Sequence, residues 1–350
     1  MDTLSRWLTA EREQWRGCAE TFRKYASAVF KAAFLGMFLC HALFLFYGYT
    51  SPDGTNEGLF YYWNQNWALS IGRWMMRYLS AAGCNVVMPA IFLAFNAACT
   101  AVAMLLLADL WHIESKPLLI LSTVSLVVAP SVIEQHLVIY MAYVYGFSLL
   151  MTALASYLVL AKKGCPSFVV AVLALACGMG GYQAWIGFAT GVIVMTLMLD
   201  CLQERPLPDI FRRAGKALAM GLLGAAVYFA VLQFEIHRYN IELSDKGGLS
   251  GFGAGSFLSG LGSKILQAYR DFKDYFTSGP NHTGKMLLVI LLGTAVLLFL
   301  GWLRLVRRRK PQAILLAALG LLLPLAINIV DVLIEGNINV LMSHPMQLVV

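Results

Sequence analysis

Two carboxylates, Asp53 and Glu57, stand four residues apart in a polar segment that follows a long apolar run. A helical segment would place both on one face, and a turn between them would still let them face one cleft. A carboxylate that is partly desolvated at a membrane surface accepts a proton better than one in bulk water. We therefore predict a general base here, although an ordinary Pro-Asp-Gly turn before a helix start explains the same residues.

Arg73 and Arg77 are also four residues apart and follow the carboxylates in the same segment. Their spacing places both side chains on one face of a helix. Guanidinium groups bind phosphate through paired hydrogen bonds, so we predict that this face holds a lipid phosphate. General contact with lipid headgroups is the alternative, and it also brings phosphate to these arginines.

Five further residues carry side chains that can bond sugar hydroxyls. Glu134 and His136 occupy a predicted short turn, and Tyr143 follows in a tyrosine-rich stretch. Tyr182 and Gln183 follow a group of glycines that predicts a tight turn or, alternatively, a break in one long helix. We predict that all five bind substrate. A solvated turn, interfacial aromatic anchors and a simple turn cap are the alternative explanations.

The composition identifies the medium in which these residues work. Hydrophobic residues make up 59% of the 350 residues and charged residues 13%, against about 25% charged in an average soluble domain. The apolar runs are long enough to cross a bilayer. The sequence therefore predicts an all-α, polytopic membrane protein with about nine transmembrane helices, at residues 27–48, 86–108, 117–133, 138–161, 165–178, 183–201, 214–233, 285–303 and 312–334.

The distribution of Lys and Arg predicts how the helices are oriented. Of the 26 basic residues, 18 fall in one set of alternate segments, most of them short, which places the N-terminus in the cytoplasm. Residues 1–26 then form a cytoplasmic amphipathic segment, and residues 27–350 form one transmembrane domain. Its two large outer loops, 49–85 and 235–284, each contain a predicted amphipathic helix along the membrane surface.

Several classes of site are not indicated. The net charge of +7 arises mostly in short loops between apolar runs, so it does not predict nucleic-acid binding. The seven cysteines are scattered without a CxxC pair, so neither a disulfide framework nor a zinc site is expected. The glycine-rich segment 247–262 lacks the Gly-Lys-Ser/Thr ending of a phosphate loop. Asp331, near the outer end of the last run, is a further candidate because carboxylates inside membranes are rare.

Three segments carry a resemblance to a known family: SPDGTNEGLFYYWNQNWALSIGRWMMRYL, VIYMAYVYGFSLLMTAL and GGYQAWIGF. The chain resembles the bacterial membrane glucosyltransferases of the type II serotype-converting family, which belong to the GT-C class. Asp53 and Glu57 occupy the family's acidic place, Gly72-Arg73 its Gly-Arg place, and Tyr182-Gln183 its Tyr-Gln place. Many relatives have an aspartate where this chain reads Tyr145-Gly146. Relatives also continue beyond the position of Val350, so we expect the chain to be incomplete at its C-terminus.

The resemblance implies a GT-C-like membrane glycosyltransferase. It would move glucose from a polyprenyl-phosphate-linked donor to a cell-surface glycopolymer such as O-antigen or wall polysaccharide, on the extracytoplasmic side of the bacterial cytoplasmic membrane. Asp53 or Glu57 would take the acceptor proton, and Arg73 and Arg77 would bind the departing phosphate. No metal or other cofactor is expected.

A transporter or flippase of lipid-linked sugars or small molecules is the alternative. Such proteins usually show an internal repeat and polar groups near the bilayer midplane. The sequence shows no repeat, and its polar clusters lie at the outer ends of the predicted spans. A membrane scaffold without enzymatic activity, with the aromatic outer helices as anchors, is a third interpretation.

Overall fold

A computed structural model describes most of the chain, and all of the regular elements among the described residues are helices. The description covers residues 2–46, 66–82, 88–138, 141–244, 260–277, 284–333 and 342–349. The predicted all-α class is confirmed.

The main helices of the predicted runs are α1 (Asp2–Phe46), α5 (Pro89–Trp111), α6 (Lys116–Val127), α7 (Pro130–Leu137), α8 (Ala142–Ala161), α9 (Cys165–Gly181), α10 (Ile186–Leu202), α11 (Leu207–Tyr239), α14 (Gly284–Arg308) and α15 (Lys310–Ile327). The others are α3 (Asn66–Ser70), α4 (Trp74–Ala82), α13 (Leu261–Thr277), α16 (Ile329–Leu333) and the 3-10 helices η2 (Gln183–Trp185) and η5 (His344–Val349).

Each predicted run coincides with a helix, but the span count of nine is not confirmed. Within the described residues, seven helices are long and apolar enough to cross a membrane. Helices α6 and α7 form an eighth span only if this pair, bent by 43°, is counted as one. Helix α9 is apolar but has only 17 residues. The chain is thus a polytopic membrane protein with seven or eight spans by these criteria.

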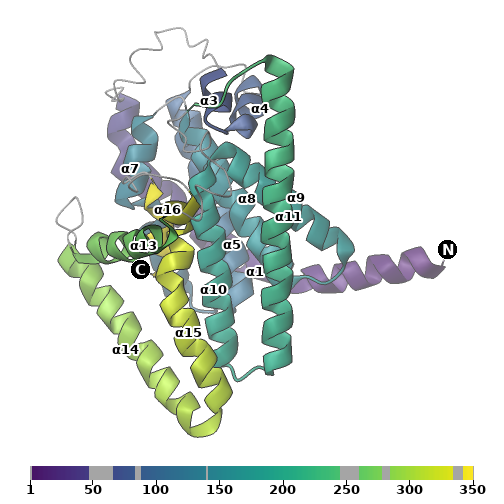
Figure 1. Cartoon of the computed structure of the whole chain (residues 1–350), viewed down its shortest axis with the longest axis vertical. Helices are drawn as coiled ribbons and strands as arrows, with labels where there is room; N and C mark the ends of the chain where they lie inside the picture. Colours follow the sequence, from purple (N-terminus) through teal and green to yellow (C-terminus); the bar gives the residue numbers. More distant parts are fainter. Residues whose placement is uncertain are drawn as a thin grey trace.

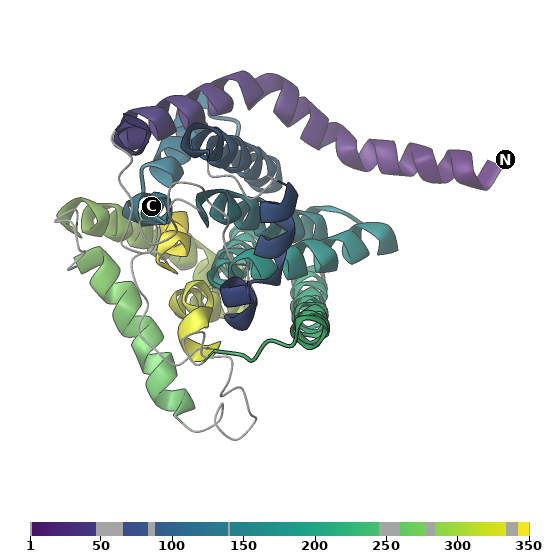
Figure 2. The same cartoon turned by 90° about the horizontal axis from the view of Figure 1, so that it is seen from above.

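Helix α8 lies at the centre of the bundle and packs against α5, α9, α10 and α11 (Figure 1). Helix α1 packs against α5 and α6, while its N-terminal part extends away from the bundle, as Figure 2 shows from above. Helix α14 lies at the periphery and exposes large apolar side chains such as Val289 and Leu297. A lipid environment accounts for such an exposed apolar face.

The first predicted outer helix is not continuous. A turn at residues 71–73 divides it into α3 and α4, because Gly72 adopts φ +82°. Within α4, Trp74 is buried and Tyr78 is exposed. The second predicted helix is present as α13, which has an apolar and a polar face.

Three other local predictions are wrong. Glu134 and His136 lie in helix α7 and not in a turn. Gly178, Gly180 and Gly181 belong to the last turns of α9, and only the extended Tyr182 separates this helix from η2. Helix α11 continues to Tyr239, so the start of the predicted loop 235–284 is helical.

The helix bundle has two ends, which lie at the top and the bottom of Figure 1. We call the end that carries α3, α4 and the adjoining ends of α8, α9 and α11 the Arg73 end. We call the end that carries the α8–α9, α10–α11 and α14–α15 turns the Asp200 end. Contacts from Lys216 to Lys162 and from Arg304 to Glu204 tie these three turns together. Most basic residues predicted to be cytoplasmic therefore gather at one end.

Candidate active site

The structure describes some of the predicted site residues and not others. Asp53 and Glu57, the predicted general bases, lie outside the described residues. The predicted phosphate-binding and substrate-binding side chains are described, and they divide into two groups.

The turn that carries Arg73 is held by two distant segments. The side-chain amide of Gln183 donates to the carbonyl oxygen of Ile71 at 2.7 Å and to the hydroxyl of Tyr228 at 3.1 Å. The Tyr228 hydroxyl in turn donates to the carbonyl oxygen of Gly72 at 2.9 Å. The Gly-Arg and Tyr-Gln segments of the sequence therefore meet in space, and their contact fixes the backbone immediately before Arg73.

Aromatic rings surround the Arg73 guanidinium. Its central carbon lies 4.6 Å from the centre of the Tyr182 ring and 5.9 Å from that of Trp67. One terminal nitrogen lies 3.5 Å from the sulfur of Met141, a weak acceptor. The Nε atom is buried without a hydrogen-bond partner, and no described carboxylate pairs with this arginine. The charge is therefore held by ring faces and remains available to an anion.

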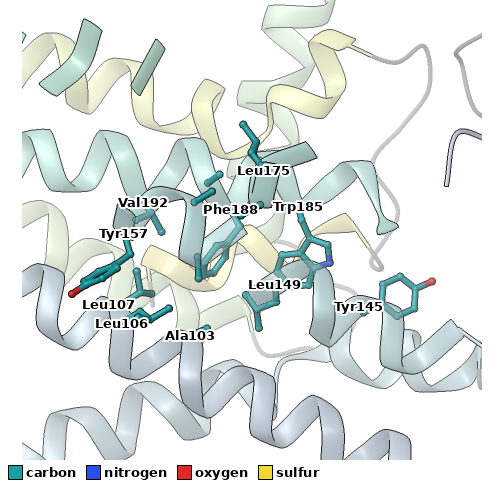
Figure 3. Close-up of a cluster of buried hydrophobic side chains, with 14 of the residues drawn as sticks. Ala103, Leu106, Leu107, Tyr145, Leu149, Tyr157, Leu175, Trp185, Phe188 and Val192 are labelled. Carbon is teal, nitrogen blue, oxygen red and sulfur yellow. The ribbon is translucent and has the colours of Figure 1, made fainter. Parts of the chain in front are cut away.

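Two buried tyrosines extend this environment. The rings of Tyr145 and Tyr182 meet edge to face with their centres 5.0 Å apart. Both side chains are buried, and neither hydroxyl has a hydrogen-bond partner. Figure 3 shows Tyr145 at one end of a buried cluster, with its hydroxyl directed away from the apolar side chains. Because an unpaired buried hydroxyl is unfavourable by about 1–3 kcal/mol, both are candidates for ligand contact.

Two glycines in α9 leave room for the side chains of Trp74 and Ser148 to pack closely against this helix. A Cβ atom at Gly180 would overlap the indole of Trp74, and one at Gly181 would overlap the hydroxyl of Ser148. The Trp74 Nε1 and Ser148 Oγ atoms are buried without partners. We call Arg73, Trp74, Tyr145, Ser148 and Tyr182 the Arg73 cluster. Its unpartnered groups are all able to donate hydrogen bonds, which suits an anionic or oxygen-rich ligand.

Arg77 lies one helical turn beyond Arg73 and has different neighbours. Its guanidinium carbon is 3.5 Å from the centre of the Tyr239 ring, and one terminal nitrogen is buried without a partner. The adjacent Tyr78 donates a hydrogen bond of 2.7 Å to Glu235. This bond to a carboxylate, together with burial, raises the pKa of Tyr78 to about 12.

The other predicted substrate-binding residues do not join the Arg73 cluster through any described contact. Glu134 is exposed on α7. His136 is buried, with its Nδ1 atom 2.7 Å from the carbonyl oxygen of Val132 and its ring stacked on His41. Its other ring nitrogen lies 3.2 Å from the side-chain nitrogen of Asn96. His136 therefore connects α7 to α1 and α5 within the bundle.

Tyr143 lies between the contacts of His136 and the Arg73 end. Its hydroxyl bonds that of Ser80 on α4, and its ring packs against Phe92. It therefore reaches the Arg73 end through α4.

Two residues of this end were missed by the sequence reasoning. Tyr228 and Glu235 lie seven residues apart in α11, and both are buried. That spacing corresponds to two helical turns, so they share a face. A glutamate at the margin of an apolar run was a usable signal, because charged residues there usually face protein or water.

Among the described residues no group of three or more His, Cys, Asp or Glu side chains is arranged to hold a metal ion. An apolar cavity of about 320 Å³ opens between α10, α14 and α15, lined by Met198, Leu298, Phe299, Trp302, Leu316, Ala317 and Gly320. Its lining suits a hydrocarbon chain and offers no acid, base or nucleophile.

The comparison with protein families agrees with the resemblance in the sequence. The family model described as glucosyl transferase GtrII matches residues 44–348, nearly the whole chain. The matched range includes both predicted carboxylates and the Arg73 cluster. No curated protein and no solved structure matches the chain.

Proposed function

The chain belongs to the glucosyl transferase GtrII family, and we propose that it transfers glucose from a polyprenyl-phosphate-linked donor to a surface glycan outside the cytoplasmic membrane. The acceptor we propose is a glycopolymer such as O-antigen or wall polysaccharide. Membrane lipids and the donor lipid are the other expected partners.

One observation carries the proposal for the donor: Arg73 is half-buried among aromatic rings, its Nε atom has no hydrogen-bond partner, and no described carboxylate pairs with it. The phosphate of the donor would supply the missing negative charge, and the unpartnered hydroxyls of Tyr145 and Tyr182 would supply further hydrogen bonds. A planar guanidinium stabilises the charge that develops on a departing phosphate. Gln183 and Tyr228 would keep this guanidinium in place by fixing the preceding turn.

The proposed transfer needs one proton acceptor. An oxygen of the acceptor glycan forms a bond to carbon 1 of glucose while the bond from that carbon to the phosphate oxygen breaks. The bonding electrons leave with the phosphate, and the hydroxyl proton passes to Asp53 or Glu57. General base catalysis of this kind contributes roughly 10²–10⁴-fold to the rate.

The proposal also assigns a side of the membrane. The Asp200 end holds the basic turns, so it would face the cytoplasm, and the Arg73 end would face outward. The lipid tail of the donor would then lie against the apolar helices while its phosphate reaches Arg73.

A membrane assay with radiolabelled polyprenyl-phosphate glucose tests the proposal. The parent protein should transfer label to surface polysaccharide, and Arg73→Lys should lower donor kcat/KM roughly 10-fold or more, because the bidentate geometry is lost. Arg212→Lys, at an exposed pair with Asp209, is the matched control and should behave like the parent. Movement of labelled lipid across vesicles without covalent transfer would instead support a flippase.

A further inference from the structure

Glu235 is a buried carboxylate that the proposed donor site does not use. Its side chain is 1% exposed on α11. One oxygen accepts the hydrogen bond from Tyr78, and the other, Oε2, is buried without a partner. No described Lys or Arg side chain forms an ion pair with it. A buried carboxylate with a free oxygen is strongly unfavourable, so packing alone does not account for it.

Glu235 lacks a hydrogen-bond donor for Oε2, whereas Arg77 lacks an acceptor for one terminal nitrogen. Its unpartnered nitrogen can only donate a hydrogen bond, whereas Oε2 of Glu235 can only accept one while ionised. The two side chains are linked through their neighbours, since Tyr78 follows Arg77 in α4 and Tyr239 lies one helical turn after Glu235 in α11. A missing partner for both must therefore donate and accept hydrogen bonds.

This requirement separates two kinds of ligand. A phosphate would satisfy Arg77, but the carboxylate of Glu235 would repel it. A sugar offers neighbouring hydroxyl groups that donate to one side chain and accept from the other. The exposed ring of Tyr78 supplies apolar surface that a sugar ring also needs, while the Tyr239 ring packs against the Arg77 guanidinium.

The position of Glu235 suits the acceptor and not the donor phosphate. Tyr228 bonds the turn beside Arg73, and Glu235 lies seven residues further along the same helix. At 1.5 Å per residue this displacement is about 10 Å toward the end of α11. Glucose attached to a phosphate at Arg73 would fit between the two places. Tyr78, which donates to the buried carboxylate, is itself 46% exposed, so this place lies at the margin of the protein surface.

We propose that Glu235, Arg77, Tyr78 and Tyr239 form a subsite that binds hydroxyl groups of the acceptor glycan. This inference rests on the proposed function, and it divides the two arginines between different ligands: Arg73 binds the donor phosphate and Arg77 a neutral sugar. Glu235 accepts a hydrogen bond from a glycan hydroxyl, while Tyr78 holds the carboxylate in place.

Glu235→Gln tests the subsite, because it keeps the shape of the side chain and an oxygen for Tyr78. The probes are radiolabelled polyprenyl-phosphate glucose and surface polysaccharide purified from a strain that lacks the gene. The variant should raise the KM for polysaccharide roughly 10-fold or more, the effect expected for one hydrogen bond to a charged group. Release of glucose to water without polysaccharide should stay within about twofold of the parent, since the donor site is unchanged.

Glu242→Gln is the control, because Glu242 is exposed just beyond α11 and loses the same charge. Direct binding of polysaccharide to the purified protein without donor gives a readout that needs no turnover, and Glu235→Gln should weaken it. If Glu235→Gln does not fold, Tyr78→Phe replaces it and should raise the same KM by a smaller factor. Unchanged polysaccharide binding, or an equal fall in glucose release to water, would overturn the subsite. Binding by the parent without any glucose transfer would instead count against the proposed function alone.

Discussion

Both ends of the helix bundle contain polar side chains inside the protein, but these are mostly hydrogen-bonded at the Asp200 end and partly unpartnered at the Arg73 end. At the Asp200 end, Asp200 is buried and pairs with Arg213 and, at 3.1 Å, with Arg205. Lys216 donates to the carbonyl oxygen of Lys162. At the Arg73 end, tyrosines and a glutamate are buried and two arginines are half-buried, yet several of their buried polar atoms have no partner.

Helix α8 shows this contrast within one element. Tyr157 lies toward the Asp200 end and donates a hydrogen bond of 2.6 Å to Asp109. Tyr145, twelve residues earlier, has no partner for its hydroxyl. Figure 3 shows the two hydroxyls pointing away from opposite ends of the same apolar cluster. The exception at the Asp200 end is Nε of Arg213, whose terminal nitrogens are nevertheless bonded.

This difference separates structural polar groups from groups that await a ligand. Satisfied buried polar atoms stabilise a particular packing, whereas unsatisfied ones lower stability and persist where a ligand completes them. We therefore expect substitutions at the Asp200 end to change stability and substitutions at the Arg73 end to change activity. Five predictions test or refine this contrast, from the largest effect to the smallest.

Loss of the predicted base should have the largest effect on activity. Asp53→Asn or Glu57→Gln should lower glucosyl transfer by about 10²–10⁴-fold, because the acceptor proton loses its acceptor. The measurement is the initial rate in membranes, normalised to protein level. Full activity in both variants would remove the carboxylates from the proposed mechanism.

Asp200→Asn should have the largest effect on stability. The substitution leaves Arg213 buried without its counter-charge, which we expect to lower the free energy of unfolding by about 3–5 kcal/mol. Thermal unfolding of the purified protein in detergent measures this change, and activity per folded molecule should remain near that of the parent. Asp209→Asn, at the exposed pair with Arg212, is the control and should change stability little. A large activity loss in folded Asp200→Asn would break the contrast.

Phenylalanine substitutions on α8 compare the two ends directly. Tyr157→Phe should lower the free energy of unfolding by about 1–3 kcal/mol, because Asp109 loses a hydrogen bond in a buried place. Tyr145→Phe should not destabilise the protein, since its hydroxyl has no partner to lose, but it should reduce transfer. The free energy of unfolding and the donor kcat/KM, measured on both variants, test this difference. Equal destabilisation by the two would contradict the assignment of Tyr145.

Tyr228→Phe tests the support of the Arg73 turn. Loss of its bonds to Gly72 and Gln183 should lower stability by about 0.5–1.5 kcal/mol. Arg73 should then be less well placed, so donor kcat/KM per folded molecule should fall by a few-fold. Leu232→Met on the same helix, a volume-conserving change, serves as control. Unaltered kinetics in Tyr228→Phe would mean that the turn holds its shape without this tyrosine.

Arg304→Gln should have the smallest effect. Arg304 and Glu204 form a 3.5 Å pair in which the arginine is largely exposed. Surface pairs of this kind contribute about 0–1 kcal/mol, so neither the unfolding temperature nor transfer should change measurably. A clear loss of activity would indicate that the Asp200 end also takes part in function.

The sequence predicted which segments form helices better than it predicted where those helices begin and end. Apolar run length determines which segments can cross a bilayer, and each predicted run coincides with one helix or with two consecutive helices. The break at Gly72 and the extension of α11 to Tyr239 were missed, because a turn and a helix end depend on contacts with distant segments. The span count of nine is not confirmed, because the pair α6 and α7 is bent by 43° and α9 has only 17 residues.

The sequence alone determined the family and the segments that carry the resemblance to it, because residue types and their spacing are local properties. The tertiary structure decided which of the polar residues are already satisfied. It brought Gln183 and Tyr228 to the turn before Arg73, directed His136 into the bundle, and left Tyr145, Arg73 and Glu235 with unpartnered atoms. Hydrogen-bond satisfaction depends on neighbours more than a hundred residues away, and no local pattern records it.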